Sequence, residues 1–113
     1  MNQSAAGIGY VEAALTLRRT EDGGRRAPIG SGYRPNWWLP EEADHVWAGG
    51  TVELVGQEEL APGATAGVRI YPFVPEVWDR VQPGSALEMC EGPTLMGKAT
   101  VTRVVPAAVT AGP

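Results

Sequence analysis

The chain has 113 residues, a formal net charge of −4 and 43% hydrophobic residues, which suits a single domain with one modest core. An acidic chain lacks the general attraction to phosphate that drives most nucleic-acid binding, and this length leaves no room for an additional nucleotide-binding domain. The only cysteine, Cys90, has no partner for an internal disulfide, so we expect a reducing, cytoplasmic setting. No apolar run approaches the roughly 20 residues of a membrane-spanning helix.

The first half of the chain predicts two strands separated by an irregular segment. Residues 1–9 are small and polar and are expected to form a flexible leader. Residues 10–19 alternate between apolar and polar positions, which predicts a strand, and Asp22-Gly23 after it is typical of a hairpin turn. Glycine, proline and arginine crowd residues 25–35, so we expect an irregular path there and no helix. A short strand is expected over residues 36–39, and the charged residues 40–47 are expected to form a surface loop.

The second half predicts four more strands. Residues 49–55 and 65–71 alternate again, and the connection between them, residues 56–63, ends in Pro62-Gly63. Pro72 should end the second of these strands, because proline has no N–H group for the sheet. Residues 76–81 are expected to form a turn or a single helical turn, with Trp78 as a lid over one end of the fold. Strands over residues 85–90 and 95–105 follow, and residues 106–113 are expected to form a flexible tail.

Six short strands without a credible helix predict an all-β domain over residues 10–105, either a barrel or a sandwich. We expect a closed six-stranded antiparallel β-barrel, because closure pairs the N–H and C=O groups that a small open sheet would leave at its edges.

The stretch Gly23–Leu39, GGRRAPIGSGYRPNWWL, contains residues that strand formation does not require. With Asp22 it reads DGGRRxP followed by GYRP, and it resembles the start of the third domain of bacterial elongation factor Tu. Weaker matches follow in the same order, so the resemblance extends over about residues 11–105: Thr51–Leu54, Pro62-Gly63, Ile70–Pro72 and Leu87–Gly92. It implies the same barrel and a link to translation, although no GxxxxGK[ST] loop for nucleotide binding occurs.

In that family the third domain contacts the T-stem of aminoacyl-tRNA, so the resemblance implies a surface for RNA or a partner here. Glu91 and Gly92 match the family's contacting Glu-Gly turn, and Asn36 stands where the family usually has Gln. The residues expected on this surface are Arg25, Arg26, Tyr33, Arg34, Asn36, Glu91 and Gly92. Pro93 and Thr94 replace a glycine and an arginine of the family, which removes a donor and a cation, so we expect weak tRNA binding. The alternative is that the arginines are solvated turn charges.

Four tryptophans exceed what one small core usually holds, which favours a protein-binding module with Trp47 and Trp78 as contacts. The alternative is that all four fill the core or close the barrel ends. A small ligand among the barrel's aromatic residues has no distinguishing motif.

No set of residues supports catalysis. Glu41, Glu42 and Asp44 lie beside the only histidine, His45, in a charged segment that we interpret as solvated and not as a metal or acid–base site. Cys90 has no neighbouring base that would make it a nucleophile. We therefore expect a non-catalytic barrel that needs no cofactor or metal and binds a protein partner, with weak tRNA contact as the alternative.

Overall fold

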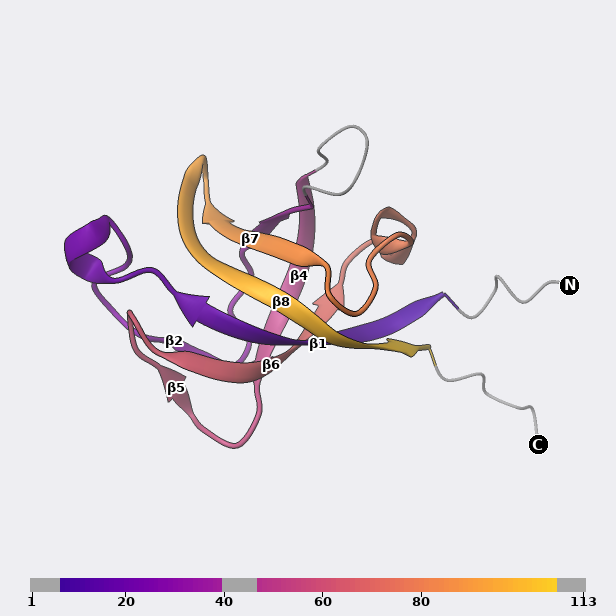
Figure 1. Cartoon of the computed structure of the whole chain (residues 1–113), viewed down its shortest axis with the longest axis horizontal. Coiled ribbons are helices and arrows are strands. Elements are labelled where there is room, and N and C mark those ends of the chain that lie inside the picture. Colours follow the sequence, from indigo (N-terminus) through magenta and orange to yellow (C-terminus); the bar gives the residue numbers. More distant parts are fainter. Residues whose placement is uncertain (1–6, 40–46, 108–113) are drawn as a thin grey trace, which may run out of the picture.

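The computed structural model describes residues 7–39 and 47–107 and confirms the all-β fold. Its main sheet is a closed antiparallel barrel of six strands in the order β1-β6-β4-β3-β7-β8 (Figure 1). These strands are β1 (Ile8–Leu17), β3 (Asn36–Trp38), β4 (Trp47–Leu54), β6 (Thr65–Pro72), β7 (Ala86–Glu91) and β8 (Thr94–Pro106). Two short 3-10 helices, η2 (Thr20–Asp22) and η3 (Pro75–Trp78), connect them, and the described part of the chain contains no helix long and apolar enough to cross a membrane.

The predicted strands occur with small changes at their ends. Strand β1 already begins at Ile8, and β6 includes Pro72, which lies opposite Gly50 at the end of the β4–β6 ladder. Trp47 was expected in a loop but is the first residue of β4, whereas residues 40–46 of that expected loop lie outside the described residues. The expected leader, residues 1–9, and tail, residues 106–113, are shortened, because Ile8 and Gly9 belong to β1 and Pro106 belongs to β8. Their remaining parts, residues 1–6 and 108–113, lie outside the described residues.

A second, two-stranded sheet was not expected from the sequence. It consists of β2 (Ile29–Gly30) and β5 (Glu59–Leu60), which lie in the segment predicted to be irregular and in the predicted connection. Ile29 lies opposite Leu60, and both side chains are buried. This small sheet therefore anchors the excursion that precedes β3 to the rest of the fold.

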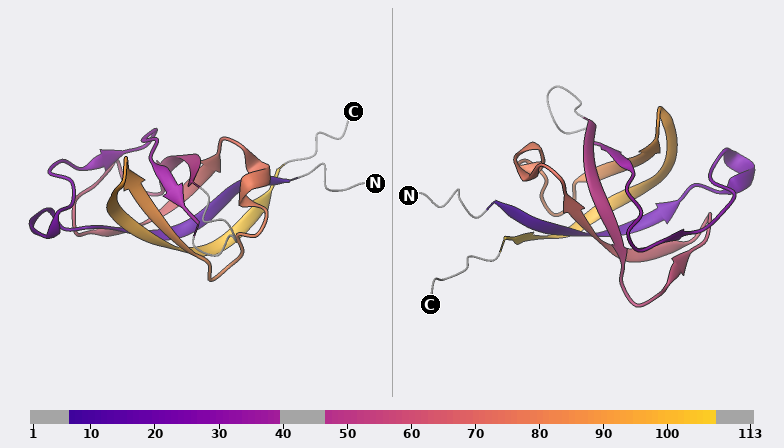
Figure 2. Two further views of the ribbon diagram at one scale, coloured as in Figure 1. Left: turned by 90° about the horizontal axis from the view of Figure 1, so that it is seen from above. Right: turned by 180° about the vertical axis from the view of Figure 1, so that it is seen from behind.

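Strand β8 closes the barrel by pairing with β1 along one edge and with β7 along the other. It has 13 residues, and the pairing skips Thr102 against β1 and Met96 against β7. An unpaired extra residue bends a strand and increases its twist, and β8 is a long curved ribbon in Figure 1. Its last residue, Pro106, pairs with Ile8, so the outer ends of β8 and β1 run side by side away from the barrel (Figure 2).

The barrel interior is filled by the alternate side chains that the sequence pattern predicted. Every second residue of β1 from Val11 to Leu17 is buried, as are Val68 and Ile70 of β6. Trp37 and Trp78 are fully buried and make an edge-to-face contact, with ring centroids 6.4 Å apart.

Gly50 of β4 makes space for these two indole rings. Its carbonyl oxygen accepts a 3.0 Å hydrogen bond from Nε1 of Trp37. A Cβ atom at this position would lie 2.8 Å from Ile70 Cγ2 and 3.2 Å from Trp78 Cζ2, so glycine leaves the space that the core aromatics occupy.

The turn after β1 depends on Gly23 and Gly24. Gly23 has φ +98°, a left-handed conformation that side chains other than glycine rarely adopt. The Gly24 N–H group donates a 2.9 Å hydrogen bond to the carbonyl oxygen of Arg19. A Cβ atom on Gly24 would lie only 2.2 Å from the carbonyl oxygen of Arg18, so the turn packs directly on the backbone that leaves β1.

We expect Gly24→Ala to lower the free energy of unfolding by about 1–3 kcal/mol, because a clash with backbone cannot be relieved by rotating a side chain. Gly67→Ala is the matched control: no atom lies within 4 Å of the Cβ position of Gly67. Alanine should be neutral there or stabilising by up to about 1 kcal/mol, since glycine loses more entropy on folding. Urea denaturation measures both variants, and equal midpoints for wild type and Gly24→Ala would contradict this account of the turn.

Candidate functional site

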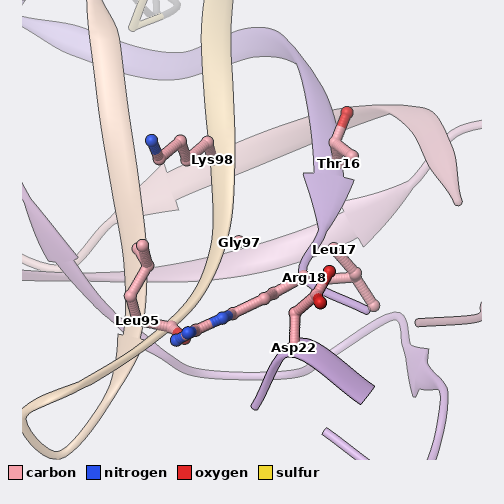
Figure 3. A pocket seen from close by; sticks show the side chains of 7 residues that line it. All are labelled: Thr16, Leu17, Arg18, Asp22, Leu95, Gly97 and Lys98. Atoms are coloured by element: carbon pink, nitrogen blue, oxygen red, sulfur yellow. The ribbon is translucent and has the colours of Figure 1, made fainter. Parts of the chain in front are cut away.

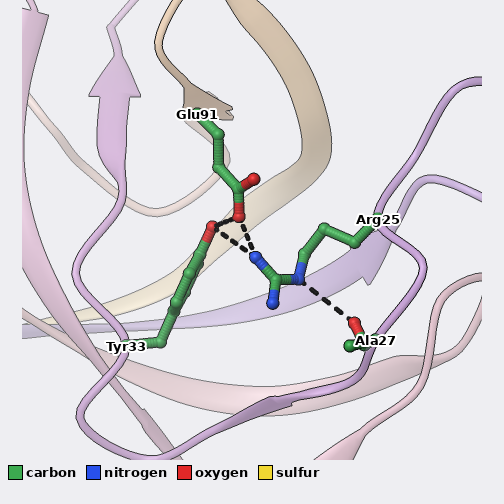
Figure 4. A network of polar contacts seen from close by, with 4 residues as sticks. All are labelled: Arg25, Ala27, Tyr33 and Glu91. Carbon is green, nitrogen blue, oxygen red and sulfur yellow. Dashed lines mark hydrogen bonds and ion pairs between the residues drawn. The ribbon is translucent and has the colours of Figure 1, made fainter.

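Three residues of the predicted RNA or partner surface form one polar cluster, which consists of Arg25, Tyr33 and Glu91 (Figure 4). Arg25 Nη1 forms an ion pair with Oε2 of Glu91, and the Tyr33 hydroxyl donates a hydrogen bond to the same oxygen. Arg25 Nη1 also donates to the Tyr33 hydroxyl oxygen at 3.4 Å, and the guanidinium carbon lies 5.0 Å from the centre of the tyrosine ring. Arg25 Nε donates to the carbonyl oxygen of Ala27 at 3.1 Å.

Separate elements bring these side chains together. Arg25 directly follows the two-glycine turn, and Glu91 is the last residue of β7. Tyr33 forms an isolated β-bridge with Val52 of β4, in which the N–H group of Val52 donates to the carbonyl oxygen of Tyr33 at 2.8 Å. The cluster therefore connects the excursion before β3 to two strands of the barrel.

The electrostatics of the cluster follow from its burial and from the Glu91 carboxylate. Burial and then the hydrogen bond and charge of Glu91 raise the pKa of Tyr33, because ionisation would place a second anion in a partly desolvated site. Burial lowers the pKa of Arg25, but its hydrogen bond and ion pair with Glu91 outweigh this, and the pKa is raised overall. The positive charge of Arg25 is thus compensated inside the cluster and is less available to a phosphate.

The other predicted residues of this surface are exposed. Asn36 lies opposite Cys90, which directly precedes Glu91. Gly92 directly follows Glu91 and has a φ angle of +56°. Arg26 and Arg34 are exposed, and neither forms an ion pair within the described ranges. The structure therefore brings Asn36 and Gly92 close to the polar cluster and leaves two cations in the adjoining loop.

The two tryptophans predicted to contact a partner lie in different environments. Trp47 is 47% exposed, and its ring packs against Trp38 of the neighbouring strand with centroids 4.7 Å apart. Trp78 is completely buried against Trp37, so it is a core residue and offers no surface to a partner. The difference arises because η3 turns its only buried side chain inward, whereas Trp47 occupies an outward position of β4.

Sequence analysis missed Phe73 and Val74, which are 55% and 52% exposed. The ring of Phe73 covers Gly49, where an added Cβ would lie 2.5 Å from Phe73 Cδ2. The sequence does mark this segment, because two large apolar residues stand between Pro72 and Pro75. Prolines interrupt strand pairing, so these two side chains are at the point where the chain leaves the sheet. We call Trp38, Trp47, Phe73 and Val74 the aromatic surface.

A row of alternating charges crosses the outside of four strands and was also missed. Arg69 of β6 lies opposite Glu12 of β1 and Glu53 of β4, at 3.6 Å and 3.8 Å between the nearest charged atoms. Arg103 of β8 lies 3.9 Å from Glu12. Tyr71 donates a 2.9 Å hydrogen bond to Glu53. The side chains of this row neutralise one another on the barrel wall.

The described ranges contain no group of three or more His, Cys, Asp or Glu side chains arranged to hold a metal ion. The segment of Glu41, Glu42, Asp44 and His45 lies outside those ranges. Cys90 is buried, and burial together with the negative charge of Glu88 raises the pKa of its thiol, which disfavours the reactive thiolate. No protein-family model matches the chain.

We expect Tyr33 to ionise at a higher pH than an exposed tyrosine. Its pKa is raised in the folded state above the value of about 10 for an unfolded chain, so its stabilising contribution is complete below about pH 10. That contribution should be lost as the pH rises further, because the unfolded state then releases the proton first. Ultraviolet absorbance titration and urea denaturation at alkaline pH measure both effects. Tyr33→Phe should remove one late-ionising group and flatten the alkaline loss of stability, and unchanged curves for this variant would refute the assignment.

Proposed function

We propose that this chain is a non-catalytic barrel related to the third domain of elongation factor Tu, and that it binds a protein through the aromatic surface. The observation that carries the proposal is the exposure of Trp47, Phe73 and Val74, each about half accessible to solvent. Clusters of exposed large apolar side chains cost solubility and usually mark interaction sites. Tryptophan is also among the residue types that dominate binding energy at protein interfaces.

The aromatic surface is continuous along neighbouring strands. Trp38 and Trp47 are opposite residues of β3 and β4, and their rings are in contact. Gly49 lies two residues beyond Trp47 on β4, and the ring of Phe73 covers it. The surface therefore extends from β3 across β4 to the segment that leaves β6, on elements held by the barrel. Such a preformed surface loses little conformational freedom when a partner binds.

The charges beside this surface suggest the chemistry of the partner. Glu88 lies opposite Trp38 on β7, and Glu76 and Asp79 follow Val74 within five residues. None of these three carboxylates forms an ion pair with another described residue. We therefore infer that the partner supplies an apolar anchor flanked by lysine or arginine side chains, which can approach both the carboxylates and the indole faces.

The link to translation rests on the DGGRRxP and GYRP motifs. It leaves a weak contact with tRNA as a second candidate function, favoured by the exposure of Arg26, Arg34 and Asn36, of which Asn36 lies opposite Cys90 beside the Glu91-Gly92 turn. The pairing of Arg25 with Glu91 works against tight binding, because it removes one of the cations available to phosphate.

We expect Trp47→Ala and Phe73→Ala each to weaken binding of the protein partner by about 30-fold or more, the effect of losing an interface hot spot. Val55→Ala is the matched control, since Val55 is also about half exposed but follows the opposite end of β4. Partners would first be captured from a lysate treated with nuclease, and their affinities then measured by titration with purified proteins. A partner that tolerates both aromatic substitutions, or is equally sensitive to Val55→Ala, would contradict the assigned surface.

For tRNA we expect weak binding at physiological salt, with an affinity that falls steeply as salt increases. Arg26→Gln and Arg34→Gln should each reduce the slope of log affinity against log salt by about one if the side chain contacts a phosphate. Arg103→Gln is the charge-matched control, because Arg103 belongs to the self-neutralising row on the barrel wall. Submicromolar binding, or a flat response to salt, would rule out this description of the contact.

A further inference from the structure

A pocket of about 390 Å³ lies on the outside of the barrel, where the ends of β1 and β8 meet the η2 turn (Figure 3). Its volume is within the range of about 300–1000 Å³ that is usual for small-ligand sites. Its walls are made by Thr16, Leu17, Arg18, Asp22, Leu95 and Lys98. None of these residues belongs to the aromatic surface or to the cluster of Arg25, Tyr33 and Glu91, so the pocket is a separate feature of the fold.

Arg18 is held in place across this pocket. Its backbone N–H group donates to the carbonyl oxygen of Met96 at 2.8 Å, and its Nη1 donates to the carbonyl oxygen of Leu95 at 3.1 Å. The other side of the guanidinium lies against Gly23, where a Cβ atom would be 3.3 Å from Arg18 Cζ and Nη2. Because a guanidinium has five N–H donors, most of them remain for a ligand while the group is already oriented.

Lys98 provides a second cation. It lies on β8 opposite Thr16 of β1 and Glu88 of β7, and its side chain is exposed. Within the described ranges, neither Lys98 nor Arg18 forms an ion pair. Both residues line the pocket, and in Figure 3 the Lys98 ammonium lies at one end of it and the Arg18 guanidinium at the other, beside Leu95.

Asp22 limits the charge that the pocket can accept. Its Oδ2 lies 3.6 Å from Nε of Arg19, but the carboxylate still lines the pocket. Two cations and one carboxylate leave the lining with a net charge of +1, and the carboxylate of Glu88, opposite Lys98 on β7, lowers the positive potential further. This suits a monoanion better than the dianion of a phosphate monoester. Leu95, which is partly buried, supplies apolar surface beside the charges, whereas the Leu17 side chain is buried behind the wall of the pocket.

From this arrangement we propose that the pocket binds a monocarboxylate attached to a short apolar group, with the carboxylate on the Arg18 guanidinium, the apolar group against Leu95, and Lys98 adding positive charge at the far end of the pocket. The same chemistry occurs in a free aliphatic acid and in the C-terminal residue of a peptide. The inference rests on the pocket alone, so it stands or falls independently of the aromatic surface and of its protein partner.

The test is a titration of the whole, isotope-labelled chain with hexanoate, hexyl phosphate and hexylamine, followed by NMR. Hexanoate should shift the backbone amide signals of Leu17, Leu95 and Lys98 in a saturable way, while hexyl phosphate binds more weakly and hexylamine does not bind. Equal binding of hexanoate and hexylamine, or shifts spread over the whole surface, would overturn the proposal.

Charge variants test the location of the site. Arg18→Gln should weaken hexanoate binding by about tenfold, as expected for loss of a charged hydrogen bond, and Lys98→Gln by about two- to threefold, as expected for loss of a more distant charge. Asp22→Asn should strengthen binding by about two- to fivefold, because it removes a like charge at the cost of an exposed ion pair. Lys98 is exposed, so Lys98→Gln keeps the test valid even if Arg18→Gln disturbs the turn, and Arg103→Gln is the control for net charge. An affinity unaffected by Lys98→Gln and Asp22→Asn would refute the site.

The two sources of the carboxylate are separated with N-acetylleucine and N-acetylleucinamide, which share the side chain and differ in the carboxylate. Tighter binding of N-acetylleucine than of hexanoate would assign the pocket to a peptide C-terminus, and the reverse order would assign it to a free acid. Binding of N-acetylleucinamide as tight as that of N-acetylleucine would contradict both, because the carboxylate would then contribute nothing.

Discussion

The close approach of backbone to the end of β1 is the constraint on which the candidate sites depend. On one side, β8 packs so closely that a Cβ atom on Gly97 would lie 2.9 Å from the carbonyl oxygen of Thr16. On the other side Gly24 lies against the carbonyl group of Arg18, at a distance that excludes any side chain. From the backbone fixed by these two contacts, the Arg18 side chain reaches the carbonyl oxygen of Leu95, and the Arg25 side chain reaches Glu91. The pocket and the polar cluster are thus two consequences of one tightly packed turn.

The tryptophans show how strand register divides one residue type between core and surface. In β3, Trp37 points inward and Trp38 outward, because successive side chains of a strand alternate between faces. Gly50 admits Trp37 and Trp78 into the same part of the core, but Nε1 of Trp78 has no hydrogen-bond partner among the residues that the structure describes. A buried, unpaired N–H group costs free energy, so apolar burial and the edge-to-face contact must compensate for it. Two tryptophans thus stabilise the barrel, while Trp38 and Trp47 remain at its surface.

Periodicity predicted β1, β4 and β6 well, because these strands are 8 to 10 residues long and alternate between apolar and polar positions. It could not predict features that arise from contacts between distant residues. Arg25 and Glu91 are 66 positions apart, and although the resemblance to elongation factor Tu placed both on one surface, nothing local showed that they pair. Trp47 was assigned to a loop because the charged residues before it mask the start of β4. The burial of Trp78 could not be predicted, because a 3-10 turn has no alternation of apolar and polar positions that would show which side chains face the core.

The distribution of charges separates structural surfaces from candidate binding surfaces. Along the row of Glu12, Glu53, Arg69 and Arg103, each charge faces an opposite one, and exposed pairs of this kind contribute little to stability. Arg25 is neutralised in the same manner by Glu91. Among the described side chains, charges without such a partner include Arg18 and Lys98 at the pocket and Glu76 and Asp79 near the aromatic surface, while Glu88 lies opposite both Lys98 and Trp38. Because these two groups have opposite signs, the ligands that they select must also differ: an anion at the turn, and a basic partner at the indole rings.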